Sequence, residues 1–173
     1  MKTPDEVIKE YEDTYFKTPI LTKPKHGWTI FTFNKFTCTP SYGTDVAVDL
    51  LDCAIAWMGH GGGVCFFDCE GDEYNFVLGP ADVFVTYIDD NGNLQAKDLT
   101  VAGYWSPNFR CAFVKNLIAC IEDNLQDWIL WDAYSVAEEI KRRKLLQNKL
   151  DTLKRLFVLE RDSDENITDW RNR

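Results

Sequence analysis

The sequence predicts an α+β protein in which an antiparallel β-meander of four to five strands packs against helices, with a long C-terminal helix. Residues 45–58 and 107–123 repeat apolar side chains at helical spacing, and a third helical pattern spans 134–160. Between the first two, short apolar segments alternate with brief turns rich in Gly, Asp and Asn. Turns this short connect antiparallel strands, because parallel pairing needs long crossovers.

The elements before the meander follow from local signals. A first helix is expected from Pro4 to about Phe16, with acidic residues in its first turn, where the helix dipole favours them. Residues 28–36 alternate bulky and polar side chains, which predicts one strand. A helix over 45–58 follows, and Thr44 or Asp45 is expected to cap it.

The meander is predicted from strands at 64–69, 74–78, 83–88 and 94–102. Asn91-Gly92 between the last two is a strong hairpin signal, since both residues tolerate positive φ. Ser106-Pro107 then begins the next helix, with a capping serine before a proline at the first helical position. A short aromatic segment precedes the last helix, which is expected over 134–160.

Composition and length indicate one folded domain over residues 1–160, followed by a polar C-terminal tail over 161–173. The chain has 173 residues, of which 45% are hydrophobic and 14% aromatic. No signal-peptide core and no apolar run of about 20 residues is visible, so we expect a cytoplasmic protein that does not enter membranes. In that compartment the six cysteines are expected to be buried free thiols rather than disulfides.

Charge is distributed unevenly along the chain, whose formal net charge is −9. Residues 1–140 contain 9 basic and 22 acidic side chains, whereas residues 141–173 contain 10 basic and 6 acidic ones. An acidic body repels nucleic acid and attracts basic proteins over distances of several ångströms. The charge therefore either attracts a basic protein partner rather than nucleic acid, or simply keeps a small protein in solution.

The most conspicuous local motif is the glycine loop, defined as Gly59, His60, Gly61, Gly62 and Gly63. Its backbone N–H groups would suit an anion, and a histidine stands at its centre, so the loop is a candidate ligand-binding site. The competing interpretation is a helix C-cap with a tight turn. No G-x-S-x-G elbow or Walker motif is present, and the order helix–loop–strand is the reverse of a dinucleotide fingerprint.

Two further groups of residues are candidates for contact with a partner. Asp45, Asp49 and Asp52 lie on the polar side of the helix over 45–58 and form either a solvated face or a docking surface. Tyr104 and Trp105 precede the next helix, where aromatic residues either anchor an interface or fill the core.

The C-terminal helix combines a basic surface with an apolar stripe. Residues 141–161 contain eight basic and two acidic side chains, while Leu146, Leu150, Leu153 and Phe157 recur at near-heptad spacing. The stripe predicts burial against the chain's own core or against a second copy, so a homodimer through this helix is one hypothesis. We expect the basic charges to complement the acidic body rather than nucleic acid.

These observations favour a small, non-enzymatic, acidic protein-binding module. By analogy of type, it would be an inhibitor or accessory protein of a phage or mobile element that masks a basic, nucleic-acid-handling partner. The alternative is a ligand- or anion-binding domain, or a small hydrolase, that uses the glycine loop with His60. No C-x-x-C or H-E-x-x-H pair is present, and neither a metal nor a cofactor is expected.

Overall fold

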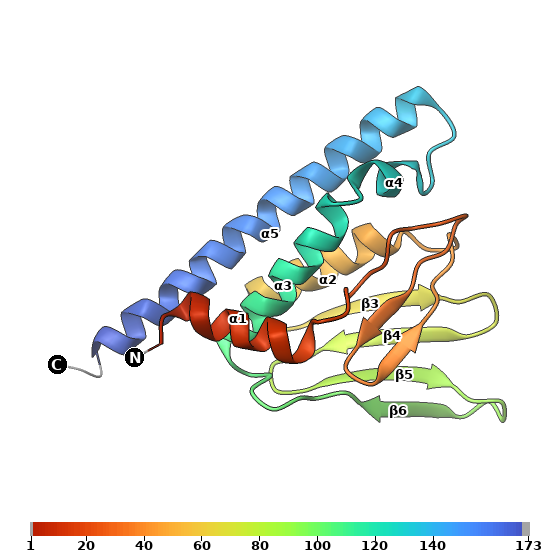
Figure 1. Cartoon of the computed structure of the whole chain (residues 1–173). Coiled ribbons are helices and arrows are strands. Elements are labelled where there is room, and N and C mark those ends of the chain that lie inside the picture. The colour runs from red at the N-terminus through yellow and green to blue at the C-terminus, as the bar shows by residue number, and fades with distance from the viewer. Residues whose placement is uncertain (1, 171–173) are drawn as a thin grey trace.

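The computed structural model describes residues 2–170, with the side chains of 164–170 left undescribed, and confirms the α+β class (Figure 1). Five helices accompany a four-stranded antiparallel sheet and a two-stranded one within this range. In chain order the elements are α1 (Pro4–Tyr15), β1 (Phe31–Phe33), β2 (Phe36–Cys38), α2 (Val46–His60), β3 (Gly63–Asp68), β4 (Glu73–Leu78), β5 (Val83–Ile88), β6 (Leu94–Asp98), α3 (Pro107–Glu122), α4 (Leu125–Leu130) and α5 (Val136–Trp170).

The predicted strand over 28–36 is instead part of a hairpin. Asn34 adopts φ +52°, a left-handed conformation that asparagine tolerates better than most residues, and the chain reverses there. Phe33 and Phe36 consequently face each other as register partners in β1 and β2. Asn34 and Lys35 are adjacent polar residues, so they interrupt the alternation of bulky and polar side chains at the point where the chain turns.

The larger sheet has the order β3-β4-β5-β6, so the predicted meander is confirmed. Its last strand is shorter than the predicted segment 94–102 and ends at Asp98. The next residue, Leu99, is buried, and its N–H donates to the carbonyl of Val83 at 2.8 Å. Leu99 thus still contacts β5 on the inner face, one residue beyond the end of β6.

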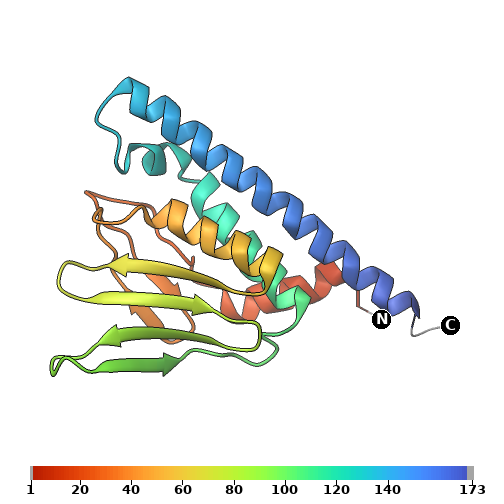
Figure 2. The same ribbon diagram turned by 180° about the vertical axis from the view of Figure 1, so that it is seen from behind.

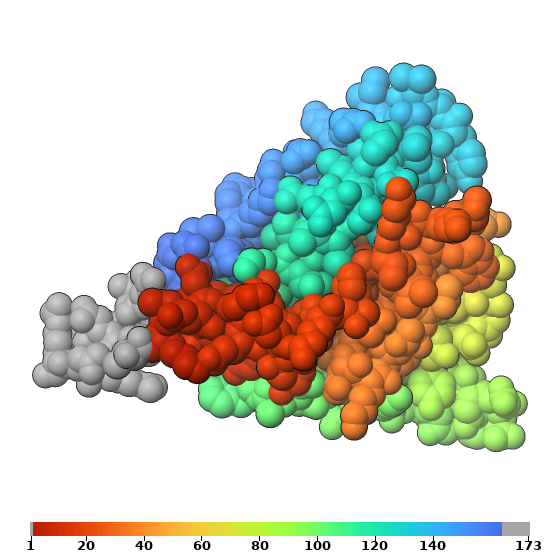
Figure 3. All heavy atoms as spheres, viewed as in Figure 1, coloured from red at the N-terminus to blue at the C-terminus, as the bar shows by residue number. Residues whose placement is uncertain are grey.

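Only one face of this sheet is covered by the rest of the protein. On the inner face Cys65, Phe67, Phe76 and Val85 are almost fully buried. The β1–β2 hairpin lies against them, and the ring of Phe31 is centred 4.6 Å from that of Phe67. In the space-filling view the orange hairpin hides most of the sheet (Figure 3). Seen from behind, the four strands lie in front with nothing over them (Figure 2).

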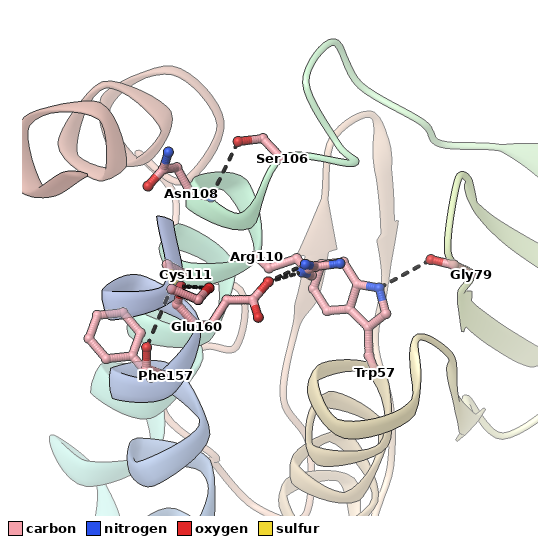
Figure 4. Close-up of polar contacts among 9 residues, drawn as sticks. Trp57, Gly79, Ser106, Asn108, Arg110, Cys111, Phe157 and Glu160 are labelled. Atoms are coloured by element: carbon pink, nitrogen blue, oxygen red, sulfur yellow. Dashed lines mark hydrogen bonds and ion pairs between the residues drawn. The ribbon is translucent and has the colours of Figure 1, made fainter. Parts of the chain in front are cut away.

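Two buried aromatic residues fix the β4–β5 turn to the helices. The Trp57 indole N–H and the Tyr104 hydroxyl both donate to the carbonyl of Gly79, at 3.1 and 2.9 Å. The two rings stack with centroids 5.4 Å apart. Figure 4 shows Trp57 reaching from α2 to Gly79. The sheet is therefore anchored to the helical layer at this corner.

The long helix α5 packs across α2 and α3 on the side away from the sheet (Figure 1). It is joined to α3 by Arg110, whose guanidinium donates to Glu160 from Nε at 2.7 Å (Figure 4). The helix continues past the predicted end at Glu160 to Trp170, through most of the predicted tail. The last tail residues, 171–173, lie outside the described residues.

No helix in the described part of the chain combines the length and apolar character that crossing a bilayer requires.

Candidate partner-binding surface

The glycine loop ends α2 and connects it to β3. Gly61 has φ +84° and caps the helix in the left-handed conformation, with its N–H donating to the Trp57 carbonyl at 2.9 Å. A β-carbon on Gly63 would lie 2.1 Å from the Cys53 carbonyl oxygen, so only glycine lets β3 approach α2 this closely. Two of the four glycines therefore have structural reasons to be glycine.

The other residues of the loop do not converge on an enclosed site. His60 and Gly59 are exposed, and the space beside the Gly59 α-carbon is open. Gly62 is also exposed. This geometry matches the helix-capping interpretation of the motif, and it provides no concave floor for a ligand.

Two of the three aspartates of the predicted acidic face of α2 pair with cations of α5, although the Asp52 side chain stays 54% exposed. Arg142, itself only 9% exposed, donates to both carboxylate oxygens of Asp45. It also donates to the carbonyls of Trp128 and Ile129, each at 3.0 Å. Asp52 pairs with Lys149 one heptad further along α5. Asp45 is thus part of the internal packing and does not serve as the predicted docking residue.

Asp49 lies between these two pairs and is partly buried. Burial, together with the negative charges of Asp45 and Asp52, raises the pKa of its carboxyl to about 6. Lys149 opposes this shift without cancelling it. The nearby cations Arg142 and Lys149 form their ion pairs with Asp45 and Asp52 rather than with Asp49.

The two predicted aromatic contact residues have opposite placements. Tyr104 is 1% exposed and belongs to the core beside Trp57, so it is not available to a partner. Trp105 is 73% exposed. Adjacent positions differ because the chain turns there: Tyr104 points into the protein and Trp105 away from it.

The apolar stripe of α5 is used within the chain. Leu146, Leu150 and Leu153 are all 0% exposed, and Phe157 packs partly buried against the same core. Of the two interpretations of this stripe, the structure supports burial in the chain's own core. A dimer interface formed by the three leucines would require α5 to detach, so this placement corrects the predicted oligomer surface.

The basic residues of α5 complement the acidic body, as predicted. Besides Asp45 and Asp52, Glu122 of α3 pairs with α5 through Lys154. In the Arg110–Glu160 pair the charges are reversed, since α3 supplies the cation and α5 the carboxylate. Three of the eight basic residues at 141–161 are thereby paired with acids elsewhere in the helical half.

The thiols offer no reactive centre. All six cysteines are free, and five of them are buried. Burial raises the pKa of the Cys53 thiol to about 12 and that of Cys65 well above its ordinary value, so both stay protonated at neutral pH. Within the described range, no group of three or more His, Cys, Asp and Glu side chains is arranged to hold a metal ion.

A surface that sequence reasoning did not single out lies on the meander itself. Residues 63–98 contain eight carboxylates and one cation, Lys97. None of these carboxylates belongs to an ion pair with a described residue, whereas the ion pairs of the molecule lie elsewhere, mostly among the helices. The acids are Asp68, Glu70, Asp72, Glu73, Asp82, Asp89, Asp90 and Asp98. The unpaired negative charge is concentrated on the sheet.

The uncovered outer face of the same sheet carries apolar residues towards both ends of its strands, with Asn75 and Thr86 between them. The register places Val64 beside Val77 and Phe84, and Ile88 beside Leu94. Val64, Ile88 and Leu94 are 59%, 60% and 70% exposed. A visible signal could have revealed this face: Val83-Phe84-Val85 and Val77-Leu78 are apolar at consecutive positions, which is typical of strands covered on both sides.

Comparison with known proteins gives no relative: no family model matches the chain, and neither do the curated proteins or the solved structures searched.

Proposed function

We propose that this chain is a protein-binding module that recognises and covers a basic surface of a partner protein. The observation that carries the proposal is the set of eight carboxylates on the meander without a cationic partner among the described residues. An isolated negative surface of this size attracts proteins rich in Lys and Arg and accelerates their association.

The class of partner follows from the same electrostatics. Proteins that bind nucleic acid carry clustered Lys and Arg side chains that contact phosphates. Carboxylates spread over a sheet can occupy such a surface in place of the phosphates. The chain would then act by masking, which requires no catalytic group of its own.

The experiment is capture from a nuclease-treated lysate, followed by quantitative binding of the captured protein. In the test variant, Asp72→Asn, Glu73→Gln and Asp90→Asn remove three meander charges. These side chains are exposed and make no hydrogen bond that shapes a turn. The control variant removes three exposed acids from the helical half, through Asp123→Asn, Asp132→Asn and Asp151→Asn.

We expect a basic protein to be captured stoichiometrically at low salt and lost at high salt, because screening weakens attraction between exposed charges. The meander variant should bind it about tenfold more weakly than the control variant, which has the same net charge. Equal affinity for both variants, or capture that is insensitive to salt, would contradict the proposal.

A further inference from the structure

The outer face of the sheet β3–β6 is composed like an interface rather than a solvated surface. In an antiparallel sheet with one face in water, that face is normally polar. Here its side chains include two partly exposed phenylalanines and four aliphatic residues: Val64, Phe66, Val77, Phe84, Ile88 and Leu94. Contiguous apolar patches of this kind in a soluble chain mark places where another molecule binds.

Acidic residues lie at two margins of the same face. The strand register puts Asp68 opposite Glu73 at one end of the β3–β4 pair and Asp98 beside Phe84 at the other margin. Alternation along the strands directs these carboxylates to the outer side, with the apolar residues. The face therefore carries two apolar groups, separated on β4 and β5 by Asn75 and Thr86, with carboxylates at its margins.

From this arrangement we propose that the outer face of β3–β6 is the docking site for the basic partner, whose contact surface combines apolar residues with Lys and Arg at its margins. The inference rests on the proposed function and adds the surface and the chemistry of the contact. Charge complementarity selects this occupant. A second copy of the chain is disfavoured, because face-to-face pairing would bring together two meanders with eight acids and one lysine each.

A cavity at the edge of this face suits a cationic side chain of the partner. It has a volume of about 500 Å³ and is lined by Asp82, Phe84, Ala96, Asp98 and Thr100. The aliphatic stem of Arg or Lys would lie on Phe84 and Ala96 while its charged end meets the two carboxylates. Hydrogen bonding from Thr100 lowers the pKa of Asp98, which keeps that carboxylate ionised.

The test is site-specific photo-cross-linking of the full chain to the protein captured in the preceding experiment. The cross-linker is introduced as Val64→p-benzoylphenylalanine or Ile88→p-benzoylphenylalanine on the outer face. As a control it is introduced as Tyr134→p-benzoylphenylalanine, at a site 83% exposed between α4 and α5. We expect cross-links to the basic partner from both outer-face positions and none from Tyr134.

A paired substitution measures the apolar contribution. Ile88→Thr with Leu94→Thr removes two exposed aliphatic side chains but keeps residues that favour strands, so the fold is retained. Ile140→Ala with Leu159→Ala removes two similarly exposed side chains from α5. The first pair should weaken partner binding at least about tenfold, and the second should change it less than about twofold.

The outcomes separate the two proposals. Capture of a basic partner that cross-links only from Tyr134, or that binds the Ile88→Thr, Leu94→Thr variant unchanged, overturns the docking face and leaves the proposed function standing. A cross-linked product containing only this chain shows that a second copy covers the face and also overturns the inference. Failure to capture any basic protein overturns both.

Discussion

At the scale of single residues, the structure shows why Asp49 differs from its two acidic neighbours. Asp45 and Asp52 each have a cation from α5 within ion-pairing distance, whereas Asp49 lies between them, partly buried. Its carboxyl consequently has a pKa of about 6, above the value of roughly 4 in an unfolded chain. Between these two values the folded state binds more protons than the unfolded state.

This difference in proton binding makes the free energy of unfolding depend on pH. Where the folded state binds more protons, the free energy of unfolding falls as pH rises. Ionisation of Asp49 should therefore destabilise the protein between about pH 4 and pH 6. Asp49→Asn, which keeps the shape and removes the charge, should increase the free energy of unfolding at pH 7 by about 1 to 2 kcal/mol after allowance for solvent screening.

The measurement is denaturant unfolding of the wild type and of Asp49→Asn at intervals from pH 4 to pH 7. The difference between the two proteins should grow across this window and then level off. Asp123→Asn, at an exposed site on the C-terminal side of α3, is the control and should show no such growth. A difference that is constant with pH would mean that Asp49 is not protonated in the folded state at low pH.

At the scale of elements, the docking of α5 depends on one buried cation more than on its surface pairs. Arg142 satisfies both oxygens of Asp45 and two backbone carbonyls of α4 while nearly inaccessible to water. Lys154 and Glu122 form a pair at 43% and 38% side-chain exposure. Removing one member of a buried pair leaves an uncompensated charge, whereas exposed pairs contribute little.

We therefore expect Arg142→Ala to reduce the free energy of unfolding by about 3 to 5 kcal/mol, and Lys154→Ala to reduce it by no more than about 1 kcal/mol. Thermal and denaturant unfolding of both variants measure the difference. Similar losses for the two variants would show that the buried network around Arg142 contributes no more than a surface pair.

The leucine stripe of α5 is buried in the chain's own core. Near-heptad spacing is shared by coiled-coil interfaces and by helices that pack into their own core, so spacing does not distinguish them. The distinction comes from α2 and α3, which lie against α5 and cover Leu146, Leu150 and Leu153 completely. No local pattern in residues 134–160 contains that information.

At the scale of the whole molecule, three cations of α5 pair with acids of the helical half, whereas the carboxylates of the meander have no ion-pair partner among the described residues. Asp68, Glu73 and Asp98 lie at the margins of a face that exposes Val64, Ile88 and Leu94. At neutral pH, negative charge keeps such faces apart, since like-charged surfaces repel. Near the pI of about 4.7 this protection is lost.

We accordingly expect the purified chain to self-associate as pH falls from 7 towards 4.7, detected by static light scattering. Ile88→Thr with Leu94→Thr should suppress the association, because it removes apolar area from the outer face. Ile140→Ala with Leu159→Ala should leave it unchanged. Suppression by the second pair instead of the first would place the adhesive surface on α5.

The sequence by itself determined the α+β class, the meander and the acidic character of the protein. These follow from properties that neighbouring residues share: helical spacing, turn chemistry at Asn91-Gly92, and charge counts. The β1–β2 turn at Asn34 escaped prediction because a polar residue fits both a strand exterior and a turn. The start of α3 was predicted correctly because helix capping is a local property. Ser106 is the N-cap, its hydroxyl accepts from the Asn108 N–H, and Pro107 is the first helical residue.

Only the tertiary structure decided which charges and apolar residues remain available. Asp45 and Leu150 look like surface residues in the sequence. In the structure Asp45 pairs with Arg142, which lies 97 residues away along the chain, and Leu150 is fully buried. Val64 and Ile88 read as ordinary strand residues, yet they remain uncovered because every other described element packs on the opposite face. Availability depends on which elements meet in space, and long-range packing is the property that local sequence patterns do not encode.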